Sequence, residues 1–139
     1  MNIIFAQEGT PWKYPGRYIF NNNLIELRDC WEFGMGTPLV GGLFINQIPV
    51  SNHKFGGPII LTDKYIYIGL FEPRRKRNTF WEQFRESHGY YISRVSYSGN
   101  VEILSKKYKL VYLLKIEDDM IYFTTSNGGK IQSIKLTPE

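Results

Sequence analysis

The sequence predicts a mainly β fold, either an antiparallel sandwich or a partly open barrel. Short segments rich in β-branched and aromatic residues recur along the 139 residues, and turn-forming residues separate them. Apolar and polar residues alternate in several segments, as they do in strands that cover a core with one face. The length is typical of one domain, so we expect a single β-rich domain over residues 1–139.

The expected strands follow one another with short connections, as in all-β domains. They are 17–20, 24–28, 43–50, 65–71, 90–97, 101–104, 110–116, 119–125 and 130–136. Residues that favour left-handed or Asx turns lie between them, at 21–23, 98–100, 117–119 and 127–129. The last five strands therefore predict a C-terminal meander. Segment 110–116 is apolar on both sides, which is typical of a strand covered on both faces, so we place it at the centre.

Two stretches of the first half show neither the helical nor the strand periodicity of apolar residues, so we expect them to be irregular loops. Residues 30–42 contain four glycines and one proline, and residues 51–58 end in Gly-Gly-Pro. The glycines have neither the dinucleotide-binding nor the P-loop spacing, so no cofactor is expected.

One segment, about 79–88, breaks the β pattern and is expected to be a short helix. Thr79 can cap its first turn, and Glu82 can reach back to the amide of Thr79. Phe80 and Phe84 then share one face, which can lie on the sheet.

The composition indicates a cytoplasmic protein. The first residues carry no positive charge ahead of their short apolar run, so we expect no secretory signal. Charged residues recur within every hydrophobic stretch, so we expect no spanning helix and no membrane partner. Cys30 is the single cysteine and cannot form an internal disulfide, which fits a reducing compartment.

The positive charge is concentrated in the second half of the chain. The net charge is +4, and residues 72–139 hold twelve basic against eight acidic side chains. A run of four basic residues at 74–77 follows Pro73 and precedes the expected helix, so we expect it on an exposed loop. The candidate binding residues are this run and nearby aromatic residues, namely Arg74, Arg75, Lys76, Arg77, Trp81, Tyr90 and Tyr91. Phosphate is one candidate partner. The alternative is that the basic run at 74–77 is a solvated loop without a binding role.

No pattern of catalytic or metal-binding residues is complete. His53 and His88 could act as a general acid and base pair in RNA cleavage if they meet in space. Cys30 and the histidines lack the ligand spacing of zinc sites, so no metal is expected. Asp29 beside Cys30 raises a thiol pKa, so Cys30 is expected to be a structural thiol.

In size and character the chain resembles the small cytoplasmic immunity proteins of bacterial polymorphic toxin and contact-dependent inhibition systems. The resemblance rests on a short, all-β, aromatic-rich sequence without an active-site pattern, and it transfers no functional residue. It implies a non-catalytic protein-binding module that covers the site of a toxin. Because this chain is basic, the toxin is expected to present an acidic surface or to be something other than a nuclease. A nucleic-acid-binding β domain and a small RNase that uses His53 and His88 remain the alternatives.

Overall fold

The computed structural model describes residues 3–6, 17–32, 39–73, 89–125 and 129–136, and all regular structure in these ranges is β. The first six strands are β1 (Ile3–Ala6), β2 (Arg17–Phe20), β3 (Asn23–Glu32), β4 (Leu39–Ile45), β5 (Ile48–Pro49) and β6 (Lys54–Thr62). The others are β7 (Tyr65–Glu72), β8 (Gly89–Ser96), β9 (Val101–Ile103), β10 (Tyr112–Glu117), β11 (Met120–Thr124) and β12 (Gln132–Lys135). The predicted mainly β class is confirmed. The helix expected at 79–88 lies outside the described residues.

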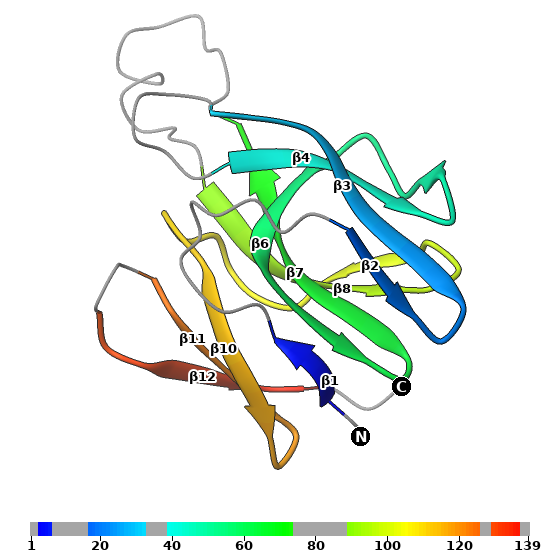
Figure 1. Cartoon of the computed structure of the whole chain (residues 1–139). Coiled ribbons are helices and arrows are strands. Elements are labelled where there is room, and N and C mark those ends of the chain that lie inside the picture. Colours follow the sequence, from blue (N-terminus) through cyan, green and yellow to red (C-terminus); the bar gives the residue numbers. More distant parts are fainter. Residues whose placement is uncertain (1–2, 7–16, 33–38, 74–88, 126–128, 137–139) are drawn as a thin grey trace, which may run out of the picture.

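Antiparallel pairing joins the strands into two sheets. The larger sheet has nine strands in the order β2-β3-β4-β6-β7-β8-β9, with β1 beside β6 and β5 beside β4. The smaller sheet is β10-β11-β12. Figure 1 shows β2–β4 on one side of β6–β8 and the smaller sheet on the other side. The architecture is therefore an open, layered sandwich rather than a closed barrel.

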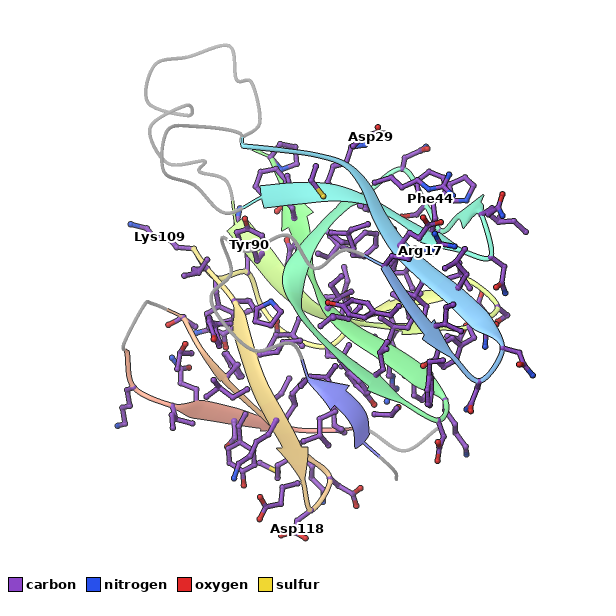
Figure 2. The ribbon with its side chains drawn as sticks, in the orientation of Figure 1. Arg17, Asp29, Phe44, Tyr90, Lys109 and Asp118 are labelled. Atoms are coloured by element: carbon purple, nitrogen blue, oxygen red, sulfur yellow. The ribbon has the colours of Figure 1, made fainter. Side chains whose placement is uncertain are left out.

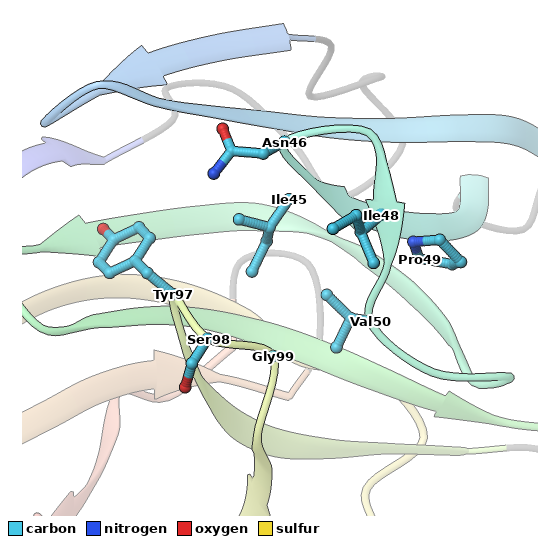
Figure 3. A pocket seen from close by; sticks show the side chains of 8 residues that line it. All are labelled: Ile45, Asn46, Ile48, Pro49, Val50, Tyr97, Ser98 and Gly99. Atoms are coloured by element: carbon cyan, nitrogen blue, oxygen red, sulfur yellow. The ribbon is translucent and has the colours of Figure 1, made fainter.

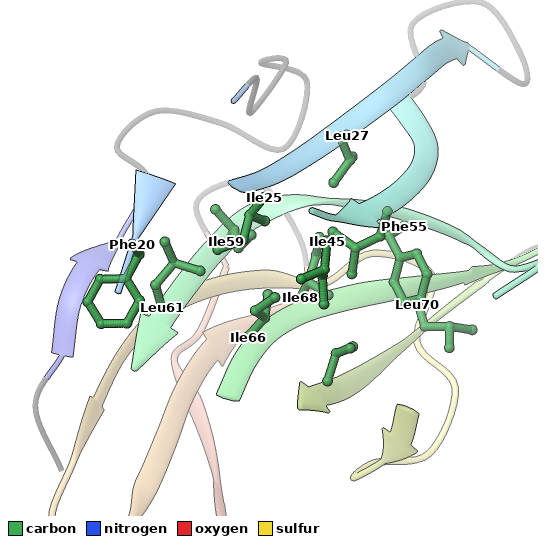
Figure 4. Close-up of a cluster of buried hydrophobic side chains, with 12 residues drawn as sticks. Phe20, Ile25, Leu27, Ile45, Phe55, Ile59, Leu61, Ile66, Ile68 and Leu70 are labelled. Atoms are coloured by element: carbon green, nitrogen blue, oxygen red, sulfur yellow. The ribbon is translucent and has the colours of Figure 1, made fainter. Parts of the chain in front are cut away.

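Two hydrophobic clusters fill the spaces on either side of the central strands β6–β8. The first cluster, of which Figure 4 labels most members, joins β2–β4 to the central strands: Phe20, Ile25, Leu27, Leu43, Ile45, Phe55, Ile59, Leu61, Ile66, Ile68, Leu70 and Val95. The second cluster joins the central strands to β10–β12: Val40, Ile60, Tyr67, Phe71, Tyr90, Ile92, Val111, Leu113, Ile116, Ile121, Phe123 and Leu136. Successive residues of a strand point to opposite faces. Strand β7 therefore supplies both clusters, which explains its unbroken apolar sequence.

The C-terminal meander is present, but it contains three strands instead of five. Strands β8 and β9 belong to the larger sheet, and β10, β11 and β12 form the smaller one. The central position predicted for 110–116 is wrong, because β10 ends its sheet and β11 lies in the middle. The pairing of β10 with β11 shifts between Leu113 and Lys115. This bulge changes the phase of the strand, so that both Leu113 and Ile116 are buried.

The expected irregular loops at 30–42 and 51–58 are largely strand. Strand β3 continues to Glu32 and β4 begins at Leu39, while the residues between them lie outside the described ranges. Strand β6 begins at Lys54 and includes the Gly-Gly-Pro sequence. Its register with β7 shifts between Gly56 and Ile60, so the glycines and the proline lie at a bulge. Bulges are where strands accommodate such residues.

Three hairpins close through left-handed pairs of residues. Asn21 and Asn22, and likewise Asp118 and Asp119, have positive φ, as the sequence predicts for the turns at 21–23 and 117–119. Positive φ at both central positions is the pattern of a type I′ turn. The third pair, Asn46 and Gln47, divides the expected strand 43–50 into β4 and β5. That hairpin builds one wall of the groove described next.

Candidate functional site

Most of the predicted binding residues fall outside the described part of the chain. These are Arg74, Arg75, Lys76, Arg77 and Trp81. Glu72 and Gly89, which flank that stretch, are directly paired in the β7–β8 ladder. The chain between them therefore leaves and rejoins the sheet at adjacent positions.

Tyr90 and Tyr91 lie on opposite faces of β8 and are both engaged in the fold. Tyr90 is 3% exposed and packs against Phe71, with ring centroids 5.3 Å apart. Burial raises the pKa of the Tyr90 hydroxyl. The Tyr91 hydroxyl donates to Glu72 Oε2 at 2.9 Å, and Lys107 Nζ lies 3.4 Å from the same oxygen. Both tyrosines therefore stabilise the start of β8, and their contact with a partner stays a prediction.

His53 lies on the exposed connection between β5 and β6. Its Nδ1 is 3.1 Å from Ser51 Oγ, and its backbone N–H donates to the same oxygen at 3.1 Å. This local turn orients the imidazole toward its own loop. His88, the other member of the expected pair, lies outside the described residues.

Cys30 is a half-buried thiol in β3. Burial raises its pKa to about 11, Asp29 adds to the rise, and Lys54 opposes it. The thiol is therefore protonated at neutral pH, as expected for a structural residue. No group of three or more potential metal ligands occurs within the described ranges. The same ranges contain no helix long and apolar enough to cross a membrane.

A groove of about 290 Å³ lies between the β4–β5 hairpin and the β8–β9 turn. Figure 3 shows the side chains that line it: Ile45, Asn46, Ile48, Pro49, Val50, Tyr97, Ser98 and Gly99. Ile48 pairs with the buried Ile45, so its side chain extends the inner face of the hairpin although it is 68% exposed. The groove is thus an open end of the first cluster.

The polar groups around the groove are fixed by the protein itself. Asn46 Oδ1 accepts from the Leu24 amide at 2.8 Å, and Asn46 Nδ2 donates to Asn23 Oδ1 at 2.9 Å. The Tyr97 hydroxyl donates to the Thr62 carbonyl at 2.7 Å, and burial raises its pKa. None of the eight lining residues is an acid or base that titrates near neutrality. The groove is suited to burying apolar side chains rather than to proton transfer.

An arginine-aromatic surface lies on the outer face of the sheet that carries this hairpin. Arg28 stacks on Phe44 at 4.4 Å from the ring centroid and binds Glu26 Oε1 at 2.7 Å. In the strand register, Arg17 of β2 lies opposite Glu26 of β3, and Pro49 of β5 lies opposite Phe44 of β4. Their side chains therefore share this face. Figure 2 shows Arg17 and Phe44 on this side of the molecule. We call Arg17, Glu26, Arg28 and Phe44 the arginine face.

The groove and the arginine face meet at β5, because Ile48 points to one and Pro49 to the other. Protein interfaces favour arginine and aromatic side chains, and the exposed Ile48 adds apolar area beside them. The pattern of residues 43–50 predicts one continuous strand, which leaves no groove at this position. The signal available was Asn46, a residue type that favours turns and tolerates positive φ, within the segment. Comparison of the chain with protein-family models, curated proteins and solved structures finds no match.

Proposed function

We propose that this chain is a non-catalytic protein-binding module that neutralises a toxin in the cytoplasm, in the manner of the immunity proteins it resembles. The observation that carries the proposal is the apolar groove with its exposed Ile48 and its already bonded polar groups. Burial of such a surface stabilises a complex without any chemical step.

The charge of the adjoining surface supports a partner with an acidic patch. The arginine face has two arginines and one glutamate, and Arg28 is stacked and ion-paired so that its position is fixed. A preordered arginine loses little side-chain entropy on binding. A carboxylate on the partner would meet this surface favourably and speed encounter.

Growth rescue tests the proposal. We expect the gene directly upstream to encode a toxin, and we expect wild-type protein to restore growth of cells that express the toxin domain. Ile48→Asp places a charge in the groove and should lower affinity for the purified toxin domain at least about tenfold. Ile131→Asp is the matched control, since Ile131 is also exposed, at 59%, but lies beside β12 in the other sheet.

Three results would oppose the proposal. A neighbourhood without a toxin gene, together with no rescue, would remove the toxin hypothesis. Equal neutralisation by wild type and Ile48→Asp would remove the groove from the interface. Salt-sensitive retention of mixed-sequence RNA or DNA would favour the nucleic-acid alternative instead.

A further inference from the structure

Strand β9 ends the larger sheet next to the groove, and the hydrogen-bond phase shows which of its groups face outward. Leu104 N–H donates to Ile92 O at 2.8 Å, and Ser96 N–H donates to Asn100 O at 2.9 Å. Hydrogen-bonded pairs alternate in an antiparallel ladder, so the pair Arg94 and Glu102 is also bonded. The backbone groups of Val101 and Ile103 therefore point to the free edge, because β9 pairs only with β8 in the described structure.

The side chains on one face of this edge continue the apolar groove. Val50, Tyr97 and Val101 all pack against the first cluster. Ile103 lies on the same face as Val101, because side chains two positions apart in a strand point to the same side. Ile103 is 51% exposed. A strand added to this edge would thus bind free backbone groups and lie beside the apolar groove.

The charge along this edge favours an acidic occupant. Glu102 is the acidic residue of β9, and it is bound by Arg94, whose side chain is only 4% exposed. Lys106 and Lys109 follow β9 and are exposed. Neither lysine has a carboxylate partner among the described residues, in contrast to Lys107, which pairs with Glu72. The edge therefore carries uncompensated positive charge at its C-terminal end.

Two other edge strands, β5 and β12, carry residues that hinder strand addition. Pro49 in β5 has no N–H to offer, and Lys135 in β12 places a charge on that edge strand. Lysine and proline are common means of preventing unwanted strand addition. Strand β9 has the sequence Val-Glu-Ile, and its glutamate is neutralised within the fold.

We propose that the protein partner binds by adding an extended segment antiparallel to β9, with apolar residues at alternate positions and acidic residues at its N-terminal end. In that orientation the N-terminal end of the segment lies beside the C-terminal end of β9, close to Lys106. Main-chain hydrogen bonds to Val101 and Ile103 supply affinity, and the apolar groove selects the alternating apolar side chains of the segment. This inference rests on the proposed protein-binding function.

Selection from a phage-displayed library of random ten-residue peptides tests the inference with the full chain. We expect enriched peptides to alternate apolar residues and to begin with Asp or Glu. Ile103→Pro removes an outward N–H but no bond of the β8–β9 ladder, and it should weaken their binding about tenfold or more. Ile103→Thr keeps the N–H and should change affinity less than about threefold. Lys106→Glu should weaken binding, while Lys115→Glu, on the other sheet, should not.

Hydrogen exchange of the wild-type chain provides a measurement that does not depend on the folding of any variant. The amides of Val101 and Ile103 should exchange at least about tenfold more slowly when an enriched peptide is bound. No enrichment, equal binding by Ile103→Pro, or unchanged exchange at these amides would overturn strand addition while growth rescue could still succeed. Peptide binding by β9 with no growth rescue would instead refute toxin neutralisation alone.

Discussion

At single residues, the fold leaves little space between strands β3 and β4. A Cβ on Gly41 would lie 2.5 Å from Cys30 Sγ and 2.6 Å from the Arg28 carbonyl oxygen. The bulge of β3 at Asp29, which has a φ of 56°, presses its backbone onto β4 at this point. Gly41 is therefore required by close approach of two strands.

Gly41→Ala should lower the free energy of unfolding by about 1–3 kcal/mol, because the bulge must move to admit the methyl group. Urea unfolding followed by circular dichroism measures the change. The neighbouring Gly42→Ala is the control, since its Cβ would meet only the Phe44 ring, at 3.2 Å. Equal loss in the two variants would contradict the role assigned to Gly41.

The buried guanidinium of Arg94 depends on Glu102. Arg94 Nε donates to Glu102 Oε2 at 2.7 Å, and the guanidinium lies 4.6 Å from the centre of the Tyr65 ring. Glu102→Gln should lower stability by about 1–3 kcal/mol, because it weakens the compensation of a buried charge. Glu117→Gln should leave the unfolding midpoint unchanged, since its partner Lys115 is solvent-exposed. Chemical unfolding of both variants side by side decides the point.

Cys30 should be a slow nucleophile with a pH-dependent rate. Its pKa of about 11 exceeds the ordinary value of 9.0, chiefly through burial. The thiolate fraction at pH 8 is then reduced, and alkylation by iodoacetamide should be at least about tenfold slower than in urea-unfolded protein. Because the folded pKa is the higher one, the rate should climb as the pH rises toward 11. Equal rates for folded and unfolded protein would contradict this prediction.

At the scale of elements, one two-residue hairpin turn holds a non-glycine residue in a strained backbone conformation. Gln47 occupies a left-handed conformation with a φ of 69° at the second central position of its turn, where glycine is favoured. This turn lies beside the groove, and it connects Asn46 to Ile48, two of the residues that line the groove.

Gln47→Gly should raise the free energy of unfolding by about 1 kcal/mol, because glycine adopts positive φ without the Cβ clash. Gln47→Ala retains that clash and should give no gain. Thermal unfolding of the two variants measures the difference. A stabilisation shared by both would show that the glutamine side chain, rather than the backbone, causes the strain.

At the scale of the whole molecule, the two clusters share one central layer. The residues of β6–β8 contribute to both clusters, so loss of the smaller sheet would expose the far side of the layer that supports the first cluster. Unfolding is therefore expected to be cooperative across all three layers.

Phe123→Ala, in the middle of the smaller sheet, should lower the free energy of unfolding by about 3–5 kcal/mol. Native-state hydrogen exchange should show the loss in β3, at the amide of Glu26 in its bonded pair with Phe44 of β4, as well as in β11. Tyr122→Ala on the same strand removes a half-buried ring that faces Lys115, and it should cost much less. Protection lost in β10–β12 alone would show that the smaller sheet unfolds independently.

The sequence by itself determined the β class, two of the three type I′ turns and most strand positions, because these follow from local backbone preference and from alternation. Tertiary structure decided which strands are central. Segments 65–71 and 110–116 are both largely apolar, yet β7 lies between two layers while β10 ends its sheet and is buried through a bulge. It also decided the candidate site. Ile48 lies far from Tyr97 and Ile103 in sequence, and only the packing of two hairpins brings an apolar groove beside the edge of β9, which is free among the described residues.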